Sequence, residues 1–228
     1  MKKPTVDYRD FRLSRINEPR FAHLKLLLGW VGYFIMYFLT ENLIPAEKCH
    51  PIHCWLDDVV PFQELFLIPY CFWYLLVGGS LLYFLLYDVD SFKKLQVFII
   101  ITQVVAMAVY VIYPSRQDLR PDVFPRENVL TAVMGFIYSF DTSTGVCPSL
   151  HVAYSLGIAS VWLKYKPASP WWKAFIVVSV VLICMATSFV KQHSVVDIVA
   201  ALPLCALAEY IVFHLIYPRS GAKTVSQN

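Results

Sequence analysis

The sequence predicts an all-α, polytopic membrane protein with six transmembrane helices and one short interfacial helix. Of the 228 residues, 58% are hydrophobic and only 15% are charged, whereas about a quarter of the residues of a soluble domain are charged. The apolar residues gather in runs of about 20, the length at which a helix crosses a bilayer. The net charge of +3 is small and the basic residues are scattered, which argues against nucleic-acid binding.

Residues 1–21 are polar and basic, and we expect them to form an N-terminal segment outside the membrane. The apolar runs that follow define one membrane domain over residues 22–217, and residues 218–228 form a polar tail. The six predicted spans are 22–44, 64–86, 96–113, 149–164, 171–190 and 195–217. The first span is too long for the apolar core of a signal peptide, and no small-residue cleavage site follows it.

Two of the apolar segments are shorter than the others. The fourth span is short, but Lys164 and Lys166 at its end can extend their charged groups to the membrane surface. Residues 128–140 are apolar but too few to cross a bilayer. We therefore expect an interfacial or re-entrant helix on the outer side of the membrane, with a packed loop segment as the alternative.

The distribution of lysine and arginine predicts the orientation. Six spans place both termini on one side of the membrane, and most basic residues lie in the segments on that side. The opposite side carries few of them: Lys48, Arg116, Arg120, Arg126 and Lys191. Because loops rich in lysine and arginine stay in the cytoplasm, both termini are predicted to be cytoplasmic and the opposite loops extracytoplasmic or lumenal.

Three polar segments on that outer face carry residues suited to chemistry. The segments are PSRQDLRP (114–121), CPSLH (147–151) and KQHSVVD (191–197). Ionisable residues at membrane depth are costly and tend to be functional. The predicted topology places all three segments on the same side of the membrane. This favours the interpretation that they form one catalytic site, and disfavours the alternative that each is an unrelated loop end.

The residue types in these segments suit phosphoryl transfer. His193 and Asp197 are four positions apart, so on a helix they share a face. A carboxylate beside an imidazole fixes its tautomer and stabilises the imidazolium. His193 is then a candidate nucleophile that forms a phosphohistidine, or alternatively a general base toward water. His151 is the candidate acid that protonates the departing alkoxide.

A phosphate-binding site is predicted next to these histidines. Pro148 and Ser149 resemble a helix start, with Ser149 as the cap, and free backbone N–H groups at such a start bind anions. Arg120 and Lys191 supply positive charge for the phosphate oxygens. Arg116 is a further candidate, with simple solvation as the alternative.

The motifs Arg120-Pro121, Pro148-Ser149-Leu150-His151 and His193-x-x-x-Asp197 resemble the three signature motifs of the type-2 phosphatidic acid phosphatase superfamily. The resemblance covers residues 114–200 and extends to the six-span layout. It implies a nucleophilic His193 oriented by Asp197, an acidic His151, and Arg120 on the phosphate. It also implies that the chain needs no metal and no other cofactor.

The chain departs from the family pattern at three places. Tyr113 stands where the first motif has a lysine, Leu150 replaces the glycine of Pro-Ser-Gly-His, and Ala186-Thr187 replace a Ser-Arg pair. Lys191 can stand in for that arginine. These departures resemble the branch with inositol phosphorylceramide synthases and sphingomyelin-synthase-like enzymes, which pass a phospho-headgroup to an alcohol instead of water. Bacterial lipid phosphatases with Pro-Ser-Leu-His share the second departure.

The segment CHPIHC (49–54) contains two cysteines and two histidines. A disulfide between Cys49 and Cys54 fits an oxidising outer face; free thiols and a metal site are the alternatives, although the spacing is tight for four ligands. Asp57 and Asp58, next along the chain, are expected to form a solvated rim.

The sequence thus predicts a lipid phosphate or diphosphate phosphatase of the bilayer that works through a phosphohistidine on the non-cytoplasmic face. The expected partners are a lipid phosphate substrate and the membrane itself, and no particular oligomeric state is predicted. The second hypothesis is a lipid phosphotransferase that moves a phospho-headgroup to a lipid alcohol. The third is a non-catalytic lipid binder or transporter.

Overall fold

The computed structural model describes residues 3–218, and within that range almost all regular structure is helical. The α-helices are α1 (Leu28–Leu43), α2 (Trp55–Val59), α3 (Leu67–Tyr87), α4 (Val89–Ile112), α5 (Val129–Phe140), α6 (Leu150–Lys164), α7 (Pro170–Phe189) and α8 (Val195–Tyr210). A π-helical turn, Ile211–Ile216, extends α8. Two short strands, β1 (His50–Pro51) and β2 (Ser115–Arg116), pair in parallel.

Five helical stretches are long and apolar enough to cross a bilayer. They are Ala22–Leu43, Glu64–Tyr87, Val89–Ile112, Pro170–Phe189 and Val195–Ile216. They correspond to five of the six predicted spans and indicate a multi-pass membrane protein. The predicted segment 128–140 forms a helix, α5.

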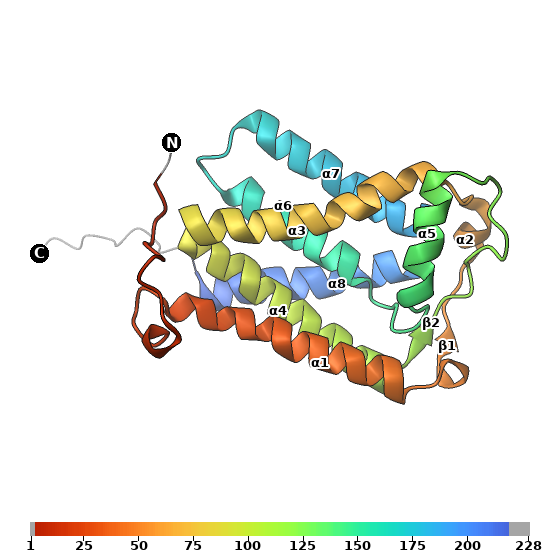
Figure 1. Ribbon diagram of the computed structural model, residues 1–228, viewed down its shortest axis with the longest axis horizontal. Helices are drawn as coiled ribbons and strands as arrows, with labels where there is room; N and C mark the ends of the chain where they lie inside the picture. The colour runs from red at the N-terminus through yellow and green to blue at the C-terminus, as the bar shows by residue number, and fades with distance from the viewer. Residues whose placement is uncertain (1–2, 219–228) are drawn as a thin grey trace, which may run out of the picture.

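The fourth predicted span is the short helix α6. Its 15 residues rise about 22 Å, less than the roughly 30 Å of a hydrocarbon core. The helix lies inside the bundle and packs against α3, α4, α7 and α8 (Figure 1). Gly157 permits the contact with α4, because a Cβ added there would lie 2.5 Å from a ring carbon of Phe98.

The connection between α3 and α4 differs from the prediction. We expected a loop with Lys93 and Lys94 before a span starting at 96, but α4 already begins at Val89. Asp88 alone joins the two helices, and its carboxylate accepts a hydrogen bond from the Ser91 N–H at 3.1 Å. This cap starts the helix early, so both lysines lie on α4 itself.

The two ends of the helix bundle carry different segments of the chain. The N-terminal segment lies at one end, where the Thr5 N–H donates to the Leu86 carbonyl at 2.7 Å, and the chain returns to this end after α8 (Figure 1). The opposite end carries α2, α5 and both strands. The three polar segments therefore lie at the end away from the termini. Met1, Lys2 and residues 219–228, including Arg219 and Lys223 of the predicted tail, lie outside the described residues.

Candidate active site

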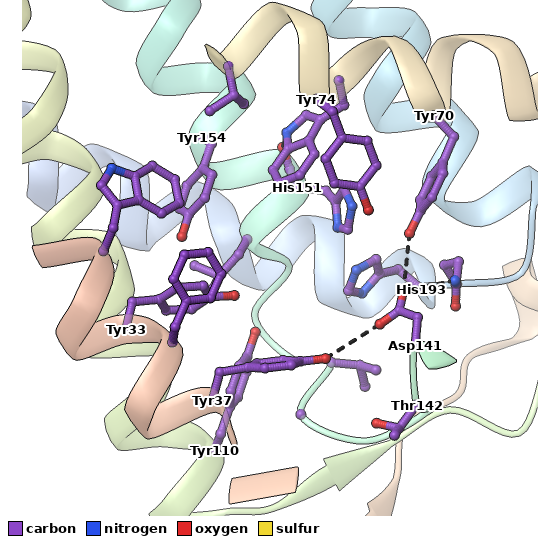
Figure 2. A pocket seen from close by; sticks show the side chains of 18 of the residues that line it. Tyr33, Tyr37, Tyr70, Tyr74, Tyr110, Asp141, Thr142, His151, Tyr154 and His193 are labelled. Atoms are coloured by element: carbon purple, nitrogen blue, oxygen red, sulfur yellow. Dashed lines mark hydrogen bonds between the residues drawn. The ribbon is translucent and has the colours of Figure 1, made fainter. Parts of the chain in front are cut away.

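A cavity of about 550 Å³ opens between the helices, and its wall includes residues of the second and third polar segments but none of the first, 114–121. Aromatic side chains form a large part of the wall, and most of the lining residues come from α1, α3, α4 and α6. One end is polar and includes Asp141, His151 and His193 (Figure 2). Gln192 also lines the cavity and donates a hydrogen bond to Asp141. The volume is typical of a site for a small molecule or part of a lipid.

His193 and Asp197 meet as predicted, in a different local structure. The Nδ1 atom of His193 lies 3.1 Å from Oδ2 of Asp197, which is fully buried. The pair does not lie within one helix, because Ser194 caps α8 and His193 precedes the cap. Asp197 Oδ2 also accepts from the Ser194 N–H at 3.0 Å. The contact leaves Nε2 of His193 as the ring nitrogen available to a substrate.

His151 lies opposite His193, with the ring centroids 5.6 Å apart. It is the second residue of α6, and its ring packs between Trp73 and Tyr70 at centroid distances of 4.2 and 4.9 Å. The Nε2 atom is buried and has no hydrogen-bond partner among residues 3–218. Buried polar atoms are nearly always paired, so this unpaired nitrogen in the cavity wall indicates a place for a ligand atom.

Ser149 caps α6, as predicted. Its hydroxyl accepts from the Val152 N–H at 3.4 Å, and its own N–H donates to the Asp197 carbonyl at 3.1 Å. Pro148 precedes the cap and follows a cis peptide bond. Ser149 thereby ties the start of α6 to the start of α8, which fixes His151 relative to His193. Its hydroxyl serves as the cap and is not part of the cavity wall.

Arg120 lies behind the polar end of the cavity and not in its wall. Its guanidinium donates to the backbone carbonyls of Asp141 and Thr142 at 2.8 and 2.9 Å and to Oε1 of Gln192 at 2.6 Å. It also stacks 4.5 Å above the Tyr138 ring. In this arrangement Arg120 holds the loop after α5 against the residue that precedes His193.

Two further predicted phosphate ligands point elsewhere. The Lys191 ammonium donates to the backbone carbonyls of Asp57 and Val60. Arg116 donates to the Asp118 carboxylate at 3.1 Å and to the Ala46 carbonyl at 3.0 Å. Neither residue lines the cavity. The charged group of each is instead hydrogen-bonded to the loop segments named above.

Asp57 is not part of a solvated rim, which corrects the prediction. Its buried carboxylate accepts from the Ser194 hydroxyl at 2.6 Å, the Val195 N–H at 2.8 Å and the Cys54 N–H at 2.8 Å. Burial opposes ionisation of Asp57, but these hydrogen bonds outweigh it and lower the pKa of the carboxyl. An acidic side chain thus occupies the start of α8, where N–H groups favour negative charge.

Asp141 is the site residue that the sequence analysis missed. It lies beside His193 and accepts from Tyr37 and Tyr70, both at 3.4 Å (Figure 2), and from Gln192 at 3.0 Å. Burial raises the pKa of Asp141 above its ordinary value, although Arg120 and His193 oppose the shift. A signal for it was present, because an acidic residue directly follows the apolar run 128–140.

The cysteines near the site are thiols. Burial and the neighbouring Asp197 raise the pKa of Cys147 to about 12, so Cys147 stays protonated and is a poor nucleophile. Cys49 and Cys54 are not bonded to each other, which corrects the disulfide prediction. The Cys49 thiol donates to the Pro45 carbonyl at 3.6 Å, whereas Cys54 caps α2. Among residues 3–218 no group of three His, Cys, Asp or Glu side chains is placed to hold a metal ion.

Comparison of the chain with models of protein families, with curated proteins and with solved structures gives no match. The chemistry assigned to the cavity therefore depends on its own geometry. Two imidazoles face each other at the polar end, one is oriented by a buried carboxylate, and aromatic side chains form much of the remaining wall.

Proposed function

We propose that the chain is an integral-membrane lipid phosphate or diphosphate phosphatase that works through a phosphohistidine. The observation that carries the proposal is the imidazole pair at the polar end of the cavity, 5.6 Å apart, with His193 held by Asp197. A phosphorus atom between the rings would be within reach of both. The residues of the three polar motifs, and their resemblance to the type-2 phosphatidic acid phosphatase superfamily, support the same chemistry.

The reaction has two steps. The Nε2 lone pair of His193 attacks phosphorus and forms an N–P bond, while the P–O bond to the lipid alcohol breaks. His151 gives the proton on Nε2 to the departing oxygen. A water molecule then attacks phosphorus and loses a proton to His151. The N–P bond breaks, its electron pair returns to His193, and phosphate leaves.

The membrane arrangement that we propose has six spans, with α6 as the fourth. Because α6 is short, His151 at its start would lie below the outer membrane surface, at the depth of a lipid phosphate. In this arrangement α5 lies at the interface, both termini are cytoplasmic, and the cavity opens on the extracytoplasmic or lumenal side.

A second candidate function is transfer of a phospho-headgroup to a lipid alcohol, and the charge of the cavity favours it. The described wall contains the carboxylic acid Asp141 and no lysine or arginine. A phosphomonoester carries close to two negative charges at neutral pH, whereas a phosphodiester carries one. A lining with a carboxylate and without fixed cations suits the diester, whose cleavage places a headgroup phosphate on His193.

An acceptor assay separates the two functions. The purified protein is given ³²P-labelled phosphatidic acid, polyprenyl diphosphate or a phosphodiester lipid, each with and without a lipid alcohol. Release of free phosphate regardless of the alcohol supports the phosphatase. A labelled new lipid, formed only with the alcohol, supports the transferase.

The same assay addresses a binder or transporter. The variants His193→Ala and His151→Ala lose either reaction if the protein is an enzyme. Full biological function in both variants would instead support a non-catalytic lipid binder or transporter and would overturn the catalytic proposal.

A further inference from the structure

The cavity continues well beyond the histidines, along a part of the molecule that the catalytic motifs do not use. Its wall on α3 runs from Tyr70 to Leu81, about 16 Å along the helix axis at 1.5 Å per residue. The facing wall comes from α1 and includes Trp30 and Phe34. The part between these walls, which we call the apolar lobe, is lined by Trp30, Phe34, Val77, Gly78 and Leu81.

The apolar lobe is open at the side of the molecule. Phe34 and Gly78 line the cavity and are also exposed, Phe34 to 58%. Tyr74, one turn from Gly78, is 53% exposed. These residues lie well inside the helices Ala22–Leu43 and Glu64–Tyr87, both long enough to cross a membrane. The side opening between α1 and α3 therefore faces hydrocarbon when the bundle is in a bilayer.

Gly78 leaves space in this opening. A Cβ atom built on Gly78 would meet no heavy atom within 4 Å. Gly79 is equally uncrowded, with nothing within 4 Å of its Cβ, but it does not line the cavity. A large side chain at position 78 would fill the lobe, while the same side chain at 79 would point to another side of α3.

We propose that the apolar lobe holds an acyl or prenyl chain of the lipid substrate, which enters sideways between α1 and α3. We infer a lipid chain as the occupant because the lobe and the imidazole pair belong to one cavity and the opening faces the bilayer. Reaction of that lipid at His193 rests on the proposed function. Binding of the chain in the lobe does not.

The lobe acts mainly by positioning. A lipid chain that leaves the bilayer for the lobe exchanges one apolar environment for another, so the transfer itself adds little affinity. A chain held at a fixed depth, however, sets how far the phosphorus lies from His193, and misplacement by about 1 Å is enough to slow a reaction about a hundredfold.

The test compares Gly78→Phe with the matched control Gly79→Phe. Each purified variant is given a lipid phosphate with two long chains and a water-soluble one with very short chains, and the ratio of the two kcat/KM values is measured. We expect Gly78→Phe to lower the long-to-short ratio at least tenfold and Gly79→Phe to leave it as in the wild type. An equal ratio in all three proteins would overturn the inference.

A binding measurement keeps this test separate from the proposed function. Phosphatidic acid with a diazirine near the end of one acyl chain is photolysed with each protein, and the labelled residues are mapped. We expect labels on Trp30, Phe34 or Leu81 in the wild type and Gly79→Phe, and their loss in Gly78→Phe. Wild-type labelling without turnover of any lipid would contradict the catalytic proposal alone. Equal labelling of the lobe in Gly78→Phe would contradict the inference.

Discussion

Asp197 acts on two neighbours with a single oxygen atom, since Oδ2 accepts from the His193 ring and from the Ser194 N–H. The first contact sets the tautomer of His193, the proposed nucleophile, and the second belongs to the cap of α8. A substitution that keeps the cap but removes the charge therefore isolates the catalytic role.

Asp197→Asn is that substitution, because an amide oxygen still accepts from the Ser194 N–H. We expect kcat to fall at least about tenfold, because the amide lacks the negative charge that stabilises a positively charged His193 ring, with a melting temperature close to that of the wild type. The measurement is turnover of a lipid phosphate together with thermal unfolding in detergent. Retention of more than a tenth of the activity would show that His193 does not depend on Asp197.

Asp141 gives a prediction about pH. Burial raises the pKa of Asp141 in the folded protein, so its ionisation is less favourable there than in the unfolded chain. The stability linked to the protonated form is present below the ordinary carboxyl range, about pH 4, and is lost as the pH rises through the raised pKa.

Asp141→Asn removes this titration while it keeps an acceptor for Tyr37 and Tyr70. We expect the variant to gain stability relative to the wild type as the pH rises from 4 to 7. Melting temperatures of both proteins in detergent across this range provide the measurement. A difference that stays constant with pH would mean that Asp141 titrates normally.

The sequence predicted which residues of the proposed site lie close together, but not the partners of the residues around them. His151, His193 and Asp197 could be found because short spacings and the alternation of spans bring them to one face. The partners of Arg120 and Lys191 could not, because they are backbone carbonyls, placed by loop conformations that have no sequence pattern. Asp141 could be noticed as the acidic residue after the apolar run 128–140, but its partners Tyr37 and Tyr70 come from helices far away in the sequence.

The five-residue helix α2 holds the start of the much longer helix α8 in place. Asp57 on α2 binds the cap and the first N–H of α8, and Lys191 from the preceding loop binds two carbonyls of the α2 segment. These contacts brace the start of α8, and with it His193, from outside the bundle.

Asp57→Ala tests this brace, with Asp58→Ala as the control, because the Asp58 side chain is exposed and its carboxylate pairs with His53. Removal of the Asp57 carboxylate leaves buried hydrogen-bond donors without an acceptor, and each unsatisfied donor costs about 1–3 kcal/mol of stability. We therefore expect a clear fall in melting temperature and in kcat.

The hydrogen bonds lower the pKa of Asp57. The stabilisation that the ionised carboxylate gives is therefore present above the ordinary carboxyl pKa and is lost as the pH falls through the pKa of the folded protein. Equal behaviour of the two variants would contradict the brace.

The elements themselves were largely predictable. Continuous apolar runs gave five helices that are long and apolar enough to span a membrane, and their bounds agree within one residue except at the start of α4. The predicted start of α4 was too late in the sequence. Asp88 caps the helix, so the polar residues before the apolar run are also helical. The short fourth run also gave the bounds of α6 to within one residue, whereas the position of α6 inside the bundle is not contained in a linear pattern.

For the molecule as a whole, the arrangement predicts which side of the membrane each end occupies. The two ends of the described chain lie together, opposite α2 and α5 (Figure 1), and the excess of basic residues on their side predicts the cytoplasm. A C-terminal green fluorescent protein should fluoresce in a bacterial host, and a C-terminal alkaline phosphatase should be inactive. The reverse result would place the cavity on the cytoplasmic side and contradict the proposed site of action.

The central claim is that a lipid phosphate transfers phosphorus to Nε2 of His193. The most direct measurement is rapid denaturation of the protein during turnover of a ³²P-labelled lipid, followed by mapping of the label. The account predicts an acid-labile, base-stable label on His193 in the wild type, a label that forms more slowly in His151→Ala because the departing alkoxide is no longer protonated, and none in His193→Ala. A label that persists in His193→Ala, or turnover with no label on His193 in either protein, would contradict it.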